Sequence, residues 1–144
     1  MKEWCENPVV NSTIGYYAQL AENDHIRLNI LVEIPAFNPH ISDSNLCVIF
    51  GNLLENAIEA CRLMKPESRY INLFSRVNGA MLFISMDNSF NGVVHKQNDE
   101  FLSSKRAGIG TGLHSVRSLA ETHSGSAEFK TTENRFRSEI CLKL

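Results

Sequence analysis

The sequence predicts an α+β fold, a two-layer α/β sandwich in which three helices cover one face of a mixed, mostly antiparallel sheet. Three observations predict it. A long apolar helix carries one narrow polar stripe, an Asn-Gly pair joins two strand-like segments, and a glycine-rich segment leads into another helical pattern. No linker or repeat divides the 144 residues, so residues 1–144 are expected to form one domain.

The first half is predicted to contain two helices and one strand. Apolar residues at helical spacing follow Pro8 and end near Asn23, with proline at the first turn. Residues 26–34 are rich in β-branched side chains and end at a proline, which predicts a strand. Ser42 offers a capping oxygen to the long helix, which is expected to run to about Met64 because a proline follows.

The second half is predicted to consist of two hairpins that flank a polar loop and a helix. The turn pair Asn78-Gly79 is the strongest hairpin signal in the chain. From Ser89 to Ala107 apolar periodicity fades, and a loop of this length in a compact domain is usually functional, so we expect a mobile lid at about 89–110. The expected regular elements are strands at 70–77 and 80–86, a helix at 112–123, and strands at 126–132 and 136–144.

Composition excludes several classes of protein. The net charge of −2 argues against general attraction to nucleic acid or to an anionic membrane. No apolar run approaches the roughly 18 residues of a membrane span, and the first residues do not form a signal peptide. The four cysteines have no C-x-x-C spacing, so we expect reduced thiols and a cytoplasmic, soluble domain that contacts neither membrane nor nucleic acid.

The long helix carries three polar residues on one face. Asn52, Asn56 and Glu59 are spaced i, i+4 and i+7, so they form a single stripe on a helix of 3.6 residues per turn. Such a helix is buried except where the stripe faces a ligand or water. The remaining surface is covered by apolar residues: Leu46, Ile49, Phe50, Leu53, Leu54, Ala57, Ile58 and Cys61.

The stripe and the glycine-rich segment together indicate a nucleotide site. An amide oxygen such as that of Asn56 can ligate Mg²⁺ without adding charge, and Asn52 can contact phosphate or metal-bound water. Glycines let backbone N–H groups approach phosphates, and the following helix directs its positive dipole end at the anion. Lys105 and Arg106 can add charge-assisted bonds. The glycine-rich segment consists of Gly108, Ile109, Gly110, Thr111, Gly112 and Leu113.

These residues carry a family resemblance. The segment 52–60 resembles the N box, and 108–113 the second glycine box, of the Bergerat-fold ATP-binding superfamily called GHKL. The order of predicted elements across the chain is similar to the catalytic ATP-binding domain of sensor histidine kinases, and looks like the quorum-sensing and peptide-sensing subgroup. The resemblance implies ATP and Mg²⁺ as cofactors, a histidine on a separate phosphoacceptor and dimerisation domain as acceptor, and a response regulator downstream.

The resemblance also implies roles for particular residues. Asn56 would ligate Mg²⁺, Asn52 would support metal and phosphate, and the glycine-rich segment would bind phosphate. Lys105 or Arg106 would stabilise charge on the transferred phosphoryl group. Glu59 would polarise the site or act as a base, and a solvated helix-face role is about equally probable. Hydrolytic members carry a Glu where this chain has Asn52, which disfavours efficient ATP hydrolysis.

Two residues compete for the adenine contact. Family members use an acidic residue in a D-x-G-x-G box, and the segment 86–92 departs from that pattern. The literal alignment selects Asp87, whereas strand alternation slightly favours Asn88 because it falls on the apolar face. An asparagine carbonyl can accept a hydrogen bond from the adenine amino group, without the charge assistance of a carboxylate.

Two further classes remain open. The chain could be a nucleotide-binding interaction module with no kinase activity or only weak ATP hydrolysis, or a soluble serine kinase of the anti-sigma type. None of the five histidines has surroundings that resemble a phosphoacceptor helix. Core packing is expected of four aromatic residues: Tyr16, Tyr17, Phe74 and Phe83.

Overall fold

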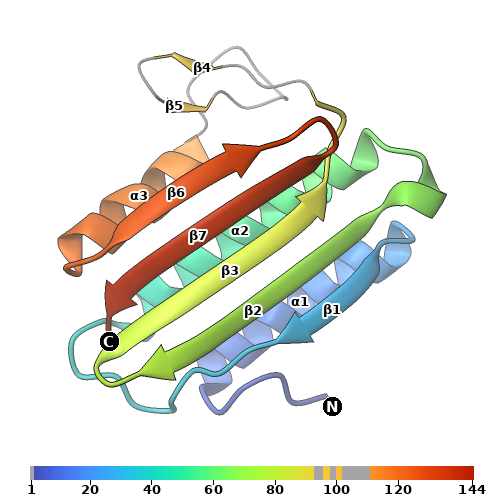
Figure 1. Cartoon of the computed structure of the whole chain (residues 1–144). Coiled ribbons are helices and arrows are strands. Elements are labelled where there is room, and N and C mark those ends of the chain that lie inside the picture. Colours follow the sequence, from blue (N-terminus) through green and yellow to red (C-terminus); the bar gives the residue numbers. More distant parts are fainter. Residues whose placement is uncertain (1, 93–95, 98–99, 102–110) are drawn as a thin grey trace.

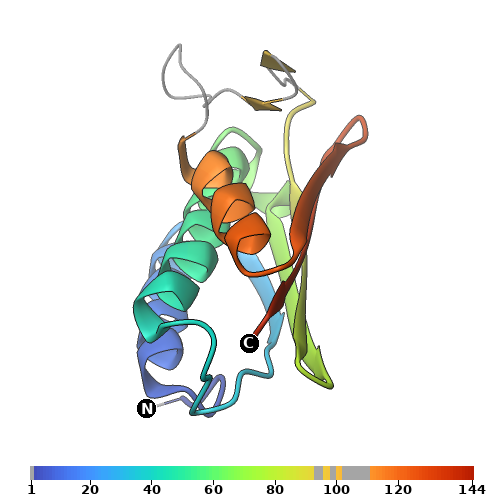
Figure 2. The same ribbon diagram turned by 90° about the vertical axis from the view of Figure 1, so that its left-hand side faces the viewer.

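The computed structural model describes residues 2–92, 96–97, 100–101 and 111–144. Its described part has two layers, with a five-stranded sheet on one side and three α-helices on the other (Figures 1 and 2). The helices all cover the same face, so the other face of the sheet, here called the open face, has no helix over it (Figure 2). The predicted α+β sandwich is confirmed.

The sheet is mixed and mostly antiparallel, as predicted. Its strand order is β1-β2-β3-β7-β6, in which β1 and β2 are parallel and the other neighbours antiparallel. A separate two-stranded ladder joins β4 and β5. The helices are α1 (Pro8–Asn23), α2 (Asp43–Arg62) and α3 (Thr111–Thr122), with a 3₁₀ turn at Pro66–Ser68. The strands are β1 (Arg27–Leu31), β2 (Tyr70–Asn78), β3 (Met81–Ser89), β4 (Lys96–Gln97), β5 (Glu100–Phe101), β6 (Ser126–Thr131) and β7 (Arg135–Lys143).

The two long helices start at a shared polar junction. The side-chain oxygen of Asn7 accepts hydrogen bonds from the backbone N–H groups of Val9 (3.1 Å) and Val10 (3.0 Å), which caps α1. Its amide nitrogen donates to the carboxylate of Asp43 at the first residue of α2 (2.9 Å) and to the carbonyl of Pro35 (3.4 Å). Asn7 is fully buried, so this one side chain caps α1 and links it to the start of α2, whose own N-cap is Ser42.

The far ends of α1 and α2 are joined by arginines. Arg69 donates to the carbonyl oxygen of Met64 (3.0 Å) just beyond α2 and to that of Asp24 (2.7 Å) at the end of α1. Arg62 pairs with the Asp24 carboxylate at 2.7 Å. These contacts supply donors to carbonyl groups that a helix end leaves without intrahelical partners.

The core lies between α2 and the helix-facing side of the sheet. All eight apolar residues predicted to surround the polar stripe of α2 are buried. The expected core packing of Tyr16, Phe74 and Phe83 is wrong: Tyr16 is 62% exposed, and the two phenylalanines lie on the open face. For the two phenylalanines the reason is that no helix of the described residues covers that face, whereas Tyr16 lies on the exposed side of α1. Tyr17 does pack against the core.

The ends of two strands differ from the prediction. β1 ends at Leu31 instead of residue 34, because the N–H of Glu33 bonds to the backbone and hydroxyl oxygens of Ser75 outside the regular ladder. β3 continues to Ser89, so Asp87 and the two following residues belong to a strand.

In the described residues no helix is long and apolar enough to cross a bilayer.

Candidate nucleotide-binding site

The polar stripe of α2 faces away from α1. A Cβ placed on Gly51 would lie 3.5 Å from the ring of Tyr17, so this flank of α2 packs on α1. Burial raises the pKa of Tyr17, and the Glu55 carboxylate adds to the effect, which places Glu55 near α1 as well. Asn52 is one residue further round the helix, toward α3. Asn52, Asn56 and Glu59 are half-buried.

The start of α3 meets the first residue of this stripe. A Cβ placed on Gly112 would lie only 3.1 Å from the side-chain oxygen of Asn52 and 3.5 Å from its Cγ. A side chain at residue 112 would therefore displace the Asn52 amide by a few tenths of an ångström. Because the first N–H groups of a helix lack intrahelical acceptors, the N-terminal end of α3 presents donors and a positive dipole end beside the stripe.

The glycine-rich segment is described only from its fourth residue onward. Thr111 is the first residue of α3, and Leu113 is buried in the core, where it anchors the helix. Several predicted site residues lie outside the described residues: Lys105, Arg106, Gly108, Ile109 and Gly110.

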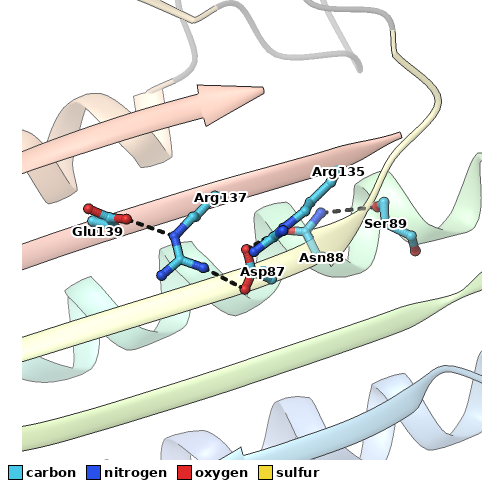
Figure 3. Close-up of polar contacts among 6 residues, drawn as sticks. All are labelled: Asp87, Asn88, Ser89, Arg135, Arg137 and Glu139. Carbon is cyan, nitrogen blue, oxygen red and sulfur yellow. Dashed lines mark hydrogen bonds and ion pairs between the residues drawn. The ribbon is translucent and has the colours of Figure 1, made fainter. Parts of the chain in front are cut away.

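Asp87 lies on the open face, in an arginine clamp. The Nε of Arg135 donates to one carboxylate oxygen at 2.8 Å, and Nη1 of Arg137 donates to the other at 2.8 Å (Figure 3). Arg137 also bonds to Glu139 at 2.7 Å, and this hydrogen bond lowers the pKa of Glu139. Both carboxylate oxygens of Asp87 thus already have charged partners, and they point away from the helices.

Asn88 lies on the opposite face, toward the helices. It is fully buried, and it continues the buried alternation of Leu82, Ile84 and Met86 along β3. Its Nδ2 donates to the carbonyl oxygen of Ser89 at 3.1 Å (Figure 3). Its Oδ1 is buried and receives no hydrogen bond from any described residue. An unpaired buried carbonyl is costly, and it indicates that a donor is supplied from elsewhere.

A second buried polar atom lies on the same face of the neighbouring strand. Ser138 of β7 pairs with Met86 in the sheet register, is 1% exposed, and its hydroxyl has no hydrogen-bond partner among the described residues. The sequence reasoning missed Ser138. A signal was available, because it is the one polar residue in the buried alternation of Phe136, Ile140 and Leu142 along β7.

Ser89 connects this end of β3 to α2. Its hydroxyl accepts a hydrogen bond from the N–H of Tyr70 (3.1 Å) and lies 3.5 Å from the thiol of Cys61 in the last turn of α2. The sequence reasoning had placed Ser89 in the lid. The structure thus brings β3, with Asn88, against the same helix that carries the amide stripe.

A hollow of about 490 Å³ lies on the open face and is lined by Phe74, Phe83 and Cys141 among others. It is on the far side of the sheet from Asn88 and the stripe of α2. It contains neither the amides of α2 nor the helix end that suit a phosphate, so the candidate site considered below is the one on the helix side.

Comparison with known families identifies the chain. The model of the GHKL domain family matches residues 41–143. The chain belongs to the GHKL family. The matched range includes α2, β3 and the start of α3, which are the elements that form the candidate site.

The GHKL domain resembles one curated sensor protein. It is 27% identical over 136 residues to the sensor protein TdiS of Thauera aromatica. The match covers 90% of this chain and 25% of TdiS. The chain therefore spans about a quarter of the length of this relative.

Solved structures of histidine kinases share the fold. The catalytic domain of the histidine kinase ThkA superposes with a TM-score of 0.66 at 17% identity, covering 94% of this chain and 90% of that one. The mycobacterial sensor histidine kinase MprB superposes with a TM-score of 0.67 at 15% identity, covering 94% of this chain and 93% of that one. The predicted resemblance to histidine kinase ATP-binding domains is confirmed. Membership of the quorum-sensing and peptide-sensing subgroup stays a prediction.

Proposed function

We propose that this GHKL domain, residues 1–144, binds ATP with Mg²⁺ on the helix side of the sheet and transfers the γ-phosphoryl group to a histidine on a separate domain. The observation that carries the proposal is the convergence of the amide stripe of α2, the start of α3 and the unpaired carbonyl of Asn88. An amide stripe, a helix N-terminus and a buried acceptor suit metal, phosphate and adenine respectively.

The donor atoms of the site fit the proposed ligand. Asn56 supplies a hard oxygen ligand for Mg²⁺, and Asn52 supports metal-bound water and phosphate. When bound, Mg²⁺ neutralises charge that develops on the phosphates. The glycine-rich segment 108–113 is proposed to donate backbone N–H groups to phosphate. Most of the lid predicted at about 89–110 lies outside the described residues, and Ser89 belongs to β3.

Asn88, and not Asp87, is proposed to accept the hydrogen bond from the adenine amino group. Asp87 faces the opposite side of the sheet, where two arginines occupy both of its carboxylate oxygens. Asn88 faces the helix side with a buried oxygen that no described residue satisfies. Ser138, on the same face of the adjacent strand, is proposed to line the same end of the site.

Transfer to an acceptor is favoured over hydrolysis. Asn52 stands where hydrolytic relatives carry a carboxylate, and an amide is not basic enough to activate water near neutral pH. Phosphoryl transfer depends mainly on positioning and on stabilisation of charge, roles assigned to Lys105 or Arg106. Glu59 is assigned to polarising the site or accepting the proton of the attacking group.

The acceptor is proposed to be a histidine of a phosphoacceptor and dimerisation domain in the same kinase, with a response regulator as the next protein in the relay. The GHKL domain would act in the cytoplasm. It would be part of a longer sensor, because its curated relative is about four times as long as the region matched.

One alternative has specific support. The residue proposed to contact adenine, Asn88, carries an amide, and this segment lacks the glycines of the D-x-G-x-G pattern. A site weakened in this way would suit an interaction module that binds nucleotide without kinase activity, or with only weak hydrolysis.

Calorimetry distinguishes whether the site binds nucleotide at all. Mg²⁺·ATP and Mg²⁺·GTP are titrated into the wild-type domain, the Asn56→Ala variant and a matched control, Glu55→Gln, which lies about 100° round α2 on the side of α1. The proposal expects ATP-selective binding that is lost in Asn56→Ala and kept in the control. The absence of binding at millimolar nucleotide would refute it. Phosphotransfer to an added phosphoacceptor domain then separates a kinase from an interaction module.

A further inference from the structure

An asparagine at the adenine position creates an ambiguity that a carboxylate does not have. A carboxylate only accepts hydrogen bonds, whereas an amide accepts at its oxygen and donates at its nitrogen. Adenine presents an amino donor at position 6, and a 6-oxo purine presents an acceptor there. The orientation of the Asn88 amide therefore decides which class of base it can recognise.

In the structure, one neighbour fixes that orientation. Nδ2 of Asn88 lies 3.1 Å from the carbonyl oxygen of Ser89 and donates to it. Rotation of the amide by 180° would bring two acceptor oxygens to that distance, which is repulsive. The observed orientation leaves Oδ1 as the unpaired, buried atom.

The Ser89 peptide is itself held from three sides. Its hydroxyl accepts from the N–H of Tyr70 in β2 (3.1 Å) and lies 3.5 Å from the thiol of Cys61 in α2. The next N–H, that of Phe90, donates to the carbonyl oxygen of Asn134 at 3.2 Å. Ser89 is 2% exposed, so these contacts are shielded from water.

We propose that Ser89 is a positioning residue that sets base selectivity. It holds the carbonyl that orients the Asn88 amide, and the site therefore selects a 6-amino purine over a 6-oxo purine. The inference rests on the proposed function, because it requires that Asn88 contacts the base.

The test uses three nucleotides: ATP, inosine triphosphate, whose 6-oxo group is accompanied by a proton on N1, and purine riboside triphosphate, which has hydrogen at position 6. Each is titrated with Mg²⁺ into wild type, Ser89→Ala, and a Ser85→Ala control in the same strand on the open face. Ser89→Ala keeps the carbonyl but removes the hydroxyl that anchors it. Ser89→Thr retains a hydroxyl and serves as the conservative variant.

The expected pattern is a change of selectivity. Wild type should prefer ATP over purine riboside triphosphate by about tenfold, the effect of one good hydrogen bond. Ser89→Ala should lose about fivefold in ATP affinity, gain affinity for inosine triphosphate and leave purine riboside triphosphate unchanged, since that ligand has no group for Asn88. Ser89→Thr and Ser85→Ala should behave as wild type.

Other results overturn the inference in distinguishable ways. A parallel loss for all three nucleotides in Ser89→Ala would show that the serine supports the fold and not the amide orientation. Equal wild-type affinity for ATP and purine riboside triphosphate would show that Asn88 does not contact the base, while nucleotide binding itself stands. No binding of any of the three would remove the proposed function together with the inference.

Discussion

Gly112→Ala should separate nucleotide affinity from stability. Gly112 lies in the first turn of α3, where alanine favours the helix by about 0.8–1.0 kcal/mol over glycine. The added methyl would lie 3.1 Å from the side-chain oxygen of Asn52, so that amide must move by a few tenths of an ångström. Asn52 is half-buried and can rotate away, which keeps the net change in the free energy of unfolding within about 1 kcal/mol of zero.

The affinity should change much more than the stability. A hydrogen bond to a charged group contributes about 1.5–3 kcal/mol, so displacing the Asn52 amide should weaken ATP binding by roughly ten- to a hundredfold. Urea unfolding measures the stability, and calorimetry with Mg²⁺·ATP measures the affinity. Gly15→Ala in α1 is the matched control: its methyl would lie at an ordinary 3.8 Å from Trp4, so affinity should not change. Wild-type affinity in Gly112→Ala would refute the placement of Asn52 in the site.

Four other substitutions test the scaffold. Asn7→Ala removes a helix cap and two further hydrogen bonds, and should lower the free energy of unfolding in urea by about 1–3 kcal/mol. Gly125→Ala should abolish cooperative thermal unfolding because its Cβ would lie 1.8 Å from a β7 carbonyl oxygen. Gly79→Ala, at a residue with φ of 63° and open space around it, should lower the free energy of unfolding by only about 1 kcal/mol. Glu139 has a lowered pKa beside Arg137, so its contribution is present above the ordinary pKa of 4.5 and is lost as pH falls through the folded value. Urea unfolding between pH 3 and 7 should therefore show a shallower acid decline in Glu139→Gln, by less than about 1 kcal/mol because the pair is exposed.

The elements and the shared face of the α2 amides could be predicted because their signals are local. Helical spacing placed Asn52 and Asn56 on one stripe, and the Asn78-Gly79 turn fixed a hairpin whose strands are neighbours in the sheet. Contacts between distant segments were not predictable in this way. The clamp on Asp87 joins residues 48 and 50 positions apart, and it forms only because β7 inserts between β3 and β6.

The faces of the strands were harder to predict than the strands themselves. The alternation of buried residues placed Asn88 on the apolar face, but the literal D-x-G-x-G alignment pointed to Asp87. Only the positions of the helices decide which face of the strand can bind a ligand beside α2. The same limitation explains the wrong expectation for Phe74 and Phe83. Aromatic residues in a strand signal a packed surface, and nothing within the strand reveals that no helix covers the open face.

The two faces of β3 also show why an amide suits position 88 better than a carboxylate. A charged group at position 88 would be fully buried with a carbonyl oxygen 3.1 Å away, and no described cation contacts that position. Burying an unpaired charge is costly, whereas a neutral amide bonds to that carbonyl and still offers an acceptor. The negative charge of this segment lies instead one residue earlier, on Asp87, where two arginines neutralise it on the open face. The segment thereby keeps a charged anchor on one face of the sheet and, on the other, the neutral amide that is proposed to contact the base.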